Sequence, residues 1–446
     1  MTTKNRTRRN FLKNASIGGA GIILAPTILK SCAPGAAPSD KIRIAHIGVG
    51  AQSQHEIKFY FVDRETLFSV ATCDPFKTRR DNTAAFINAK YKERGYNVPE
   101  VESIKHYEEV LSRDDVDAVH ITTPDHWHVP MSIYAARAGK HVMVAKPLGL
   151  SIDNFKILEK EVAANNVKFH YATQQRAQGQ MIAGIDMIKS GAIGEIEQVD
   201  VWCAGSGNHG NAMCVEAAVP EGFDYDLWTG PAPMNPYCAE RVTNKGSWYN
   251  YDFSIGWLGG WGAHPLDIMV WGIKEQLKGN YTCEGEGKYW DAGGVYNNIK
   301  SWDLKLKYDS GLKVNFLSSD RLAEKDFLHY RKKKHGNGTT FWGTKGWISL
   351  SRGAAEASDP ELNAKLEVAQ STPKEFGQMF VDVIKGTIAE TNPLDEAIMS
   401  DTISHMGDMA IRTGTKITWD SKQNRVIDNE GANQYFTRDM RNPYVV

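Results

Sequence analysis

The chain has 446 residues, of which 41% are hydrophobic and 24% are charged, and its formal net charge is −1. These values are typical of an ordinary globular chain that is long enough for two domains. A net charge this close to zero argues against nucleic acid or an acidic membrane surface as the main partner.

Residues 1–40 are interpreted as an export leader followed by a tether. Arg8 and Arg9 stand ahead of a short run of small and apolar residues, which is typical of a signal peptide of the twin-arginine route. That run is too short and too rich in glycine for a membrane span. Residues 29–32 (LKSC) resemble a lipoprotein cleavage box and predict a lipid on Cys32. A plainly cleaved leader, in which Cys32 has no role, is the alternative. We therefore expect a periplasmic protein, attached to a membrane only through that lipid.

A short apolar strand at residues 42–48 (IRIAHIG) runs into a glycine turn. Gly48 and Gly50 allow the tight turn and the close backbone approach that a pyrophosphate needs, and the helix that follows would direct its amides at that anion. Ser53 stands at the third glycine of the usual fingerprint, so the motif is incomplete. A second strand ends at Asp74, where a carboxylate would bind the adenosine ribose and repel a 2′-phosphate. This arrangement favours NAD over NADP.

Strands and helices alternate from this turn to residue 172. Further apolar strands are predicted at 116–122, 141–144 and 167–172, with helices between them. Such alternation predicts an α/β fold with a doubly wound parallel sheet, in which ligands bind beyond the carboxyl ends of the strands. Three polar clusters fall at these ends: Asp74, TPDHWH at 123–128, and AKP at 145–147. We expect them to lie together.

The second part of the chain contains strand-like stretches at 195–204 (EIEQVDVWCA) and 302–319 (WDLKLKYDSGLKVNFLSS). Their alternating pattern predicts a mostly antiparallel sheet. The six cysteines show no C-x-x-C pair and no zinc-ligand spacing, so we predict no metal site. An oxidising compartment would permit a disulfide among Cys203, Cys214 and Cys238.

Six motifs in chain order resemble the glucose–fructose oxidoreductase, inositol dehydrogenase and MocA (Gfo/Idh/MocA) family. They are GVG after the first strand, CDP, TPDHWHV, AKPLG, TQQRAQ and GGWGAHPLDI, and the likeness covers essentially the whole mature chain. It implies a Rossmann domain at 41–172 and a C-terminal α+β domain at 173–446 with a large, open, mostly antiparallel sheet, used for substrate binding and for assembly into a dimer or tetramer. Exported family members carry a tightly bound nicotinamide dinucleotide that is loaded in the cytoplasm. Such a protein must be exported in its folded state, which would explain a signal peptide of the twin-arginine route.

The resemblance also implies the catalytic residues. In the family, the lysine of a Glu-Lys-Pro motif lies beside the nicotinamide. Lys146 matches it, although Ala145 stands where glutamate is usual. His264 matches the histidine that takes the proton from the substrate hydroxyl, and Gly260 stands where many relatives have an aspartate. Asp267, three residues after His264 on a predicted helix, is expected to compensate.

The remaining expected contacts form two groups. The expected cofactor contacts are Gly48, Gly50, Ala51, Gln52, Ser53, Asp74, Thr123, Pro124, Asp125, His126, Trp127, His128, Lys146, Gln174 and Gln175. The expected substrate contacts are Lys146, Arg176, Trp261 and His264. The aromatic stretch 247–253 (SWYNYDF) either lines the sugar site or belongs to a core or interface.

We therefore expect a periplasmic oxidoreductase that transfers a hydride from a sugar or glycoside carbinol to tightly bound NAD and leaves a ketosugar, with carbon 3 as a candidate position. The alternative is an NAD-dependent glycoside hydrolase of the same family, which oxidises the sugar transiently and eliminates the aglycone. That branch lacks the lysine, so Lys146 favours the oxidoreductase. A third interpretation, a non-catalytic sugar-binding protein, is supported by Ala145 and Gly260.

Overall fold

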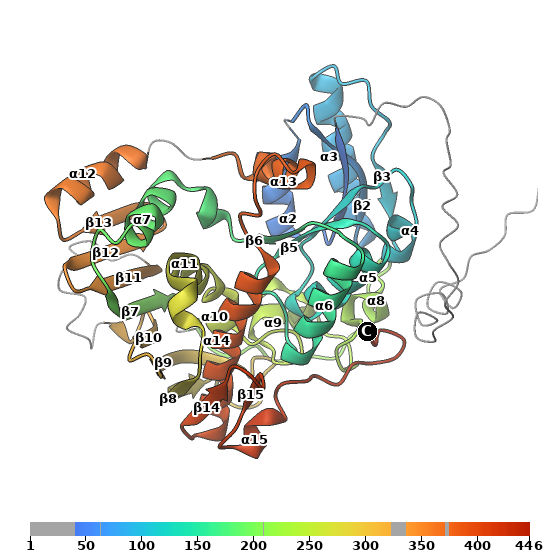
Figure 1. Cartoon of the computed structure of the whole chain (residues 1–446). Helices are drawn as coiled ribbons and strands as arrows, with labels where there is room; N and C mark the ends of the chain where they lie inside the picture. Colours follow the sequence, from blue (N-terminus) through green and yellow to red (C-terminus); the bar gives the residue numbers. More distant parts are fainter. Residues whose placement is uncertain (1–40, 63, 208, 323–335, 371–373) are drawn as a thin grey trace, which may run out of the picture.

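The computed structural model describes residues 41–62, 64–207, 209–322, 336–370 and 374–446. The predicted leader, with its arginine pair and Cys32, lies outside these residues. Two sheets lie side by side, and helix α14 (Leu394–Thr413) runs between them (Figure 1). Within the described ranges, no helix is long and apolar enough to span a membrane.

The first sheet has six strands, all paired in parallel, in the order β3-β2-β1-β4-β5-β6. The strands are β1 (Ile42–Ile47), β2 (Leu67–Cys73), β3 (Glu102–Ile104), β4 (Ala118–Ile121), β5 (His141–Ala145) and β6 (Phe169–Ala172). Ile47 pairs with both Cys73 and Ile121, so the carboxyl ends of the central strands meet at one edge. The predicted doubly wound parallel sheet is confirmed.

Alternate side chains of β1 serve two different cores, as the period of a strand requires. Ala45 and Ile47 pack in the same core as α4 (Tyr107–Leu111), α5 (His128–Arg137) and α6 (Ile152–Ala164). Ile44 faces the other way, into a core with α2 (Ala51–Glu56), its π-helical continuation η1 (Ile57–Phe61) and α3 (Lys77–Glu93). Because both faces are covered, β1 is apolar almost throughout.

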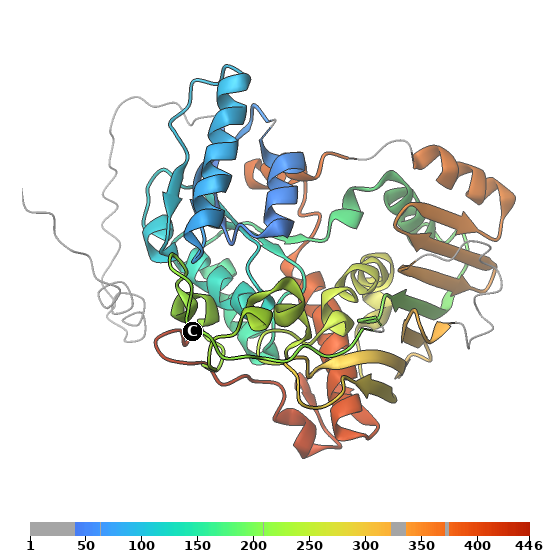
Figure 2. The same ribbon diagram turned by 180° about the vertical axis from the view of Figure 1, so that it is seen from behind.

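Two later segments return to this first unit. Helix α13 (Phe376–Lys385) packs its buried Phe376 and Phe380 into the core of α2 and α3, and it lies beside α2 in both views (Figures 1 and 2). It ends at Gly386 in the left-handed conformation, which glycine adopts readily. The last residues also return, since the hydroxyl of Tyr134 donates to the carbonyl of buried Tyr444 at 2.7 Å.

The second sheet has nine strands in the order β13-β12-β11-β7-β10-β9-β8-β14-β15. All neighbours are antiparallel except β7 and β10, so the prediction of a mostly antiparallel sheet is confirmed. The strands are β7 (Ile196–Cys203), β8 (Tyr281–Tyr289), β9 (Ile299–Tyr308), β10 (Lys313–Ser318), β11 (Gly338–Gly343), β12 (Gly346–Ser351), β13 (Ala354–Ala357), β14 (Ile417–Asp420) and β15 (Arg425–Val426).

Helix α11 (Ala263–Ile273) and α14 pack against each other and against this sheet. Together they place the candidate site between the two sheets. The other α-helices are α7 (Gly179–Lys189), α8 (Tyr225–Thr229), α9 (Asn244–Tyr249), α10 (Trp257–Gly260), α12 (Pro360–Ala369) and α15 (Glu430–Asn433). Short 3-10 turns are η2 (Asp125–Trp127), η3 (Gln174–Ala177), η4 (Ala239–Val242) and η5 (Lys274–Leu277).

Candidate active site

In the glycine turn after β1, one glycine packs tightly against neighbouring backbone and the other faces open space. Gly48 has φ +80°, and a Cβ there would lie 2.8 Å from the carbonyl oxygen of Thr122 and the amide nitrogen of Thr123. Only glycine fits this position. A Cβ on Gly50 would meet nothing closer than Arg79 Nη1 at 3.9 Å, so this side of the turn faces open space.

The carboxylate of Asp74 stabilises this turn through two hydrogen bonds from backbone amides. Its Oδ2 accepts from the amide of Val49 at 2.9 Å, and its Oδ1 accepts from the amide of Phe76 at 2.8 Å. Burial raises the pKa of Asp74, while Arg79 and the two amides pull it down. Each oxygen keeps a second lone pair, and the residue lines the adjoining cavity, so a ribose hydroxyl can still donate to it.

A cavity with about 1170 Å³ of empty space runs along the carboxyl ends of the parallel strands. Twelve of the fifteen expected cofactor contacts line it: Gly48, Gly50, Ala51, Gln52, Asp74, Thr123, Pro124, Asp125, Trp127, His128, Lys146 and Gln174. Thr123 Oγ1 is buried here without a hydrogen-bond partner. An elongated cavity at this edge, an open glycine turn and an unpaired hydroxyl fit a dinucleotide.

A second pocket, with about 1090 Å³ of empty space, opens on the side of the second sheet. Five residues line both spaces: Gln52, Asp125, Lys146, Gln174 and Trp248. The second pocket also holds His264, Trp257 and Trp261. The ring centroid of Trp257 lies 6.2 Å from that of Trp248 and 5.8 Å from that of Trp261, which makes one aromatic wall. A molecule bound there would therefore touch the cofactor space at Lys146.

Lys146 reaches across from β5 to the second unit. Its Nζ donates to the carbonyl oxygen of Gly260 at 3.1 Å. Burial lowers the pKa of this amine, although the carboxylates of Asp125 and Glu56 oppose the change. The backbone carbonyl of Gly260 is therefore a partner of Lys146 and not of His264.

His264 is a buried, neutral base. Its side chain is 3% exposed, and its Nδ1 has no hydrogen-bond partner. Burial, and then the positive charges of Lys146 and Arg352, keep the pKa of the ring well below its usual range. The ring lies 5.6 Å from that of Trp261. An unprotonated ring with a free nitrogen is suited to accept a proton from a hydroxyl group.

Asp125 stands at the junction of the two spaces. Its Oδ2 accepts from the hydroxyl of Ser254, which belongs to the second unit, at 2.7 Å. Burial raises the pKa of this carboxyl, while His128, Ser254 and Lys146 pull it down. Asp125, predicted as a cofactor contact, therefore also places a carboxylate beside Lys146.

Glu56 is a site residue that the sequence analysis missed. It is 2% exposed and lines the cofactor cavity. Its Oε1 accepts from Gln52 at 2.8 Å and from Gln174 at 2.6 Å, and its Oε2 lies 2.8 Å from Nε2 of His120. These bonds fix two expected cofactor contacts from opposite sides. A glutamate in a short helix gives no signal of this in the sequence.

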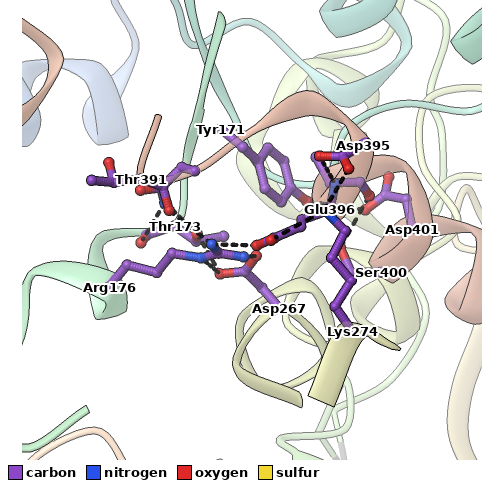
Figure 3. A network of polar contacts seen from close by, with 12 residues as sticks. Tyr171, Thr173, Arg176, Asp267, Lys274, Thr391, Asp395, Glu396, Ser400 and Asp401 are labelled. Atoms are coloured by element: carbon purple, nitrogen blue, oxygen red, sulfur yellow. Dashed lines mark hydrogen bonds and ion pairs between the residues drawn. The ribbon is translucent and has the colours of Figure 1, made fainter. Parts of the chain in front are cut away.

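Asp267 and Arg176 lie outside both spaces. The structure therefore corrects the predicted catalytic role of Asp267 and the predicted substrate contact of Arg176. Arg176 binds Asp267 through two hydrogen bonds, at 2.8 and 2.5 Å, and Thr173 donates to the same carboxylate at 2.7 Å (Figure 3). Arg176 also donates to Glu396 at 2.6 Å. Both residues are buried, and neither lines either space. Asp267 faces Arg176 while His264 faces the pocket, so Asp267 does not orient His264.

Three expected cofactor contacts also lie off the cavity. His126 points the other way, toward Phe253 and the carbonyl of Trp228, and lines a separate pocket. Burial lowers its pKa to about 3. Ser53 and Gln175 are buried beside the cavity but do not line it. Ser53 Oγ and Gln175 Oε1 have no hydrogen-bond partner among the described residues.

Family models match both parts of the chain. One, described as the NAD-binding Rossmann fold of an oxidoreductase family, matches residues 42–173, and the other, its C-terminal alpha/beta domain, matches residues 206–446. The chain belongs to the Gfo/Idh/MocA oxidoreductase family. The Rossmann domain is therefore an NAD-binding domain, as predicted.

Solved Gfo/Idh/MocA structures share the fold. The WlbA dehydrogenase from Bordetella pertussis, in complex with NADH and UDP-GlcNAcA, superposes with a TM-score of 0.60 at 15% identity, over 85% of this chain and 97% of that chain. The aldose-aldose oxidoreductase from Caulobacter crescentus, complexed with glycerol, gives a TM-score of 0.57 at 17% identity, over 84% and 99%. At these identities the likeness concerns the fold alone.

Curated relatives match a shorter stretch. A glycosyl hydrolase family 109 protein of Shewanella pealeana is 32% identical over 160 residues, 33% of this chain and 34% of its own length. An alpha-N-acetylgalactosaminidase of Shewanella oneidensis is 29% identical over 209 residues, 43% of this chain and 44% of its own. The chain thus spans less than half the length of these relatives.

Proposed function

We propose that this Gfo/Idh/MocA protein oxidises a secondary hydroxyl of a sugar or glycoside with tightly bound NAD. The observation that carries the proposal is the placement of Lys146. It lines both the dinucleotide cavity and the aromatic pocket that holds His264. A substrate carbon in that pocket would thus lie between two bases and the cofactor space.

The residues of the chain supply binding and proton transfer. NAD, when bound, supplies the hydride acceptor. The hydroxyl proton of the substrate goes to the neutral imidazole of His264 or to an unprotonated Nζ of Lys146, whose burial lowers the pKa and makes the neutral amine more accessible. Loss of both proton and hydride from one carbinol leaves a ketone, and carbon 3 of the ring is the candidate position.

The aromatic wall supports a carbohydrate substrate. Trp248, Trp257 and Trp261 line the pocket, and aromatic rings of this kind stack on the C–H faces of sugar rings. The stretch 247–253, for which the sequence left core and site open, contributes Trp248 to this wall. Two of the solved relatives were captured with a sugar nucleotide or a polyol, as their names state.

We further propose that the protein works in the periplasm. Cys214 and Cys238 form a disulfide in the second unit. Structural disulfides persist in oxidising compartments, which agrees with the predicted leader. A cofactor loaded before export would then have to be reoxidised in place by a second substrate.

A transient-oxidation glycoside hydrolase is the second candidate, because the curated relatives carry that name. Such an enzyme would oxidise the sugar, eliminate the aglycone and return the hydride. The presence of Lys146 in the pocket argues for the net oxidoreductase.

Chromatography of aryl glycosides after incubation with the protein separates the two candidates. We expect an intact aryl ketoglycoside. Free aglycone would favour the hydrolase, and an unchanged glycoside together with no change at the cofactor would contradict both. The His264→Asn variant serves as the inactive reference.

A further inference from the structure

One guanidinium stands at the mouth of the substrate pocket. Arg352 lies in the turn between β12 and β13 and lines the pocket with Lys146 and His264. Its side chain is exposed, and its Cζ lies 5.1 Å from the centroid of the Trp261 ring. The guanidinium is thus held over one end of the aromatic wall by a cation–π contact.

Arg352 has no carboxylate partner among the described residues. Two other arginines of this unit do have carboxylate partners: Arg176 binds Asp267 and Glu396, and Arg412 binds Asp408 at 2.8 Å. No hydrogen bond or ion pair joins Arg352 to a described residue. Its charge reaches into the site, since after burial it is among the causes that lower the pKa of both Lys146 and His264.

The charges of the pocket are separated in space. Arg352 is the cation of its outer end, and Asp125, beside the titratable amine of Lys146, is the one carboxylate among its described lining residues. Asp125 lies at the inner end, beside Lys146, and accepts from Ser254. The outer end is therefore positive and uncompensated. A neutral sugar needs no such group, whereas the fork of a guanidinium matches a carboxylate or an ester of sulfate or phosphate.

We propose that the substrate is an anionic sugar, with a uronic-acid carboxylate as the first choice, and that Arg352 binds the anionic group while the tryptophan wall binds the ring. This inference rests on the proposed function for the position of the sugar. Arg352 lies over the Trp261 ring and lines the substrate pocket but not the cofactor cavity, so a sugar bound against this wall has the guanidinium beside it.

Calorimetric titration of the holoprotein with matched pairs of ligands tests the inference without turnover. Each pair is a methyl hexoside and the corresponding methyl hexuronide, in the gluco and galacto series, and sulfate and phosphate esters of the same hexosides form two further arms. We expect one anionic series to bind at least tenfold more tightly than its neutral partner, and the preference to shrink at high salt. The arm with the largest preference identifies the anion.

Two substitutions make the result specific. In Arg352→Gln we expect the preference to fall to less than threefold. In Lys345→Gln, which removes an exposed positive charge at the other end of β12, we expect it to be kept.

Equal binding of neutral and anionic partners by the wild type, or an unchanged preference in Arg352→Gln, would overturn the inference. A kcat/KM for hydride transfer from the hexuronides that is the same in wild type and Arg352→Gln would also overturn it while leaving the proposed function standing. Selective anion binding without hydride transfer would instead remove the proposed function.

Discussion

Burial determines the acid–base behaviour of Lys146 and His264. Burial lowers the pKa of both groups, and Arg352 adds to this at each, although the carboxylates of Asp125 and Glu56 oppose the change at Lys146. A neutral amine and a neutral imidazole are the forms that can accept a proton. The same placement makes Lys146 the residue that joins the cofactor space to the substrate space.

Replacing Lys146 with methionine is expected to reduce the rate of sugar oxidation by about 10²–10⁴-fold, the usual range for a lost acid–base group. The side chains have similar size, so bound NAD and the melting temperature should change little. Single-turnover spectroscopy measures the rate. Lys416→Met, at an exposed position, is the control and should behave as the wild type. A Lys146→Met protein within threefold of the wild-type rate would contradict the role.

The pH dependence should show which base acts. Because its pKa lies below the ordinary 10.5, the amine of Lys146 loses its proton at a lower pH than a free lysine. If Lys146 accepts the proton, kcat/KM should rise with pH to a plateau, with a midpoint below 10.5, and this rise should vanish in Lys146→Arg. His264 is already neutral over this range. A rise that survives in Lys146→Arg and is lost in His264→Asn would assign the proton to His264 instead.

Helix α11 shows how packing separates two residues that the sequence pairs. His264 and Asp267 are three apart, and ten of the eleven residues of the helix are buried, so both of its sides meet protein. One side faces the pocket and the other faces η3, where Arg176 takes the carboxylate. Spacing along a helix does not identify the partner that each side meets.

Asp267→Asn is therefore expected to act on stability. It leaves the Arg176 guanidinium buried and only partly compensated by Glu396, which should cost about 3 kcal/mol. Thermal unfolding should show a melting temperature lower by several degrees, while the folded variant keeps its turnover within about threefold. Asp309→Asn, at an exposed turn, is the matched control. A stable Asp267→Asn protein with greatly reduced turnover would restore the catalytic role.

The disulfide is the second element with a measurable contribution. Cys214 and Cys238 are 24 residues apart, and a loop of that length corresponds to about 3 kcal/mol of stabilisation on the chain-entropy estimate. Cys238 packs with Tyr249 and Trp290, next to the helix that carries Trp248. The double replacement by serine should lower the melting temperature, and reductant should lower that of the wild type equally. A wild-type melting curve that does not respond to reductant would contradict the contribution.

Local patterns predicted the strands well and the caps less well. The strands at 42–48, 141–144 and 167–172 are present because buried parallel strands need continuous apolar runs. Ser151 is the N-terminal cap residue of α6, yet its hydroxyl makes no capping bond and donates to the carbonyl of Phe436 at 3.2 Å. That partner comes from the far end of the chain. Tertiary contacts of this kind leave no local trace.

At the scale of the whole molecule, the two sheets and their order of connection make the site. The parallel sheet brings Asp74, Thr123 and Lys146 to one edge, as parallel strands must. The second unit supplies the opposite wall, including Gly260, His264 and Arg352. The first set was predictable from strand ends. The position of Arg352 was not predictable, because the sequence of a hairpin turn does not indicate which pocket the turn lies beside.

The ultraviolet–visible spectrum of the protein as purified, without added cofactor, tests the central claim most directly. On mixing with neutral and anionic glycosides, the account predicts a rise in the absorbance of reduced nicotinamide that is at most stoichiometric with protein, together with a ketosugar product. The rise should be absent in Lys146→Met with its cofactor retained. A protein that holds no dinucleotide, or that holds one and shows no absorbance change with any sugar while Lys146 and His264 are intact, would contradict the account.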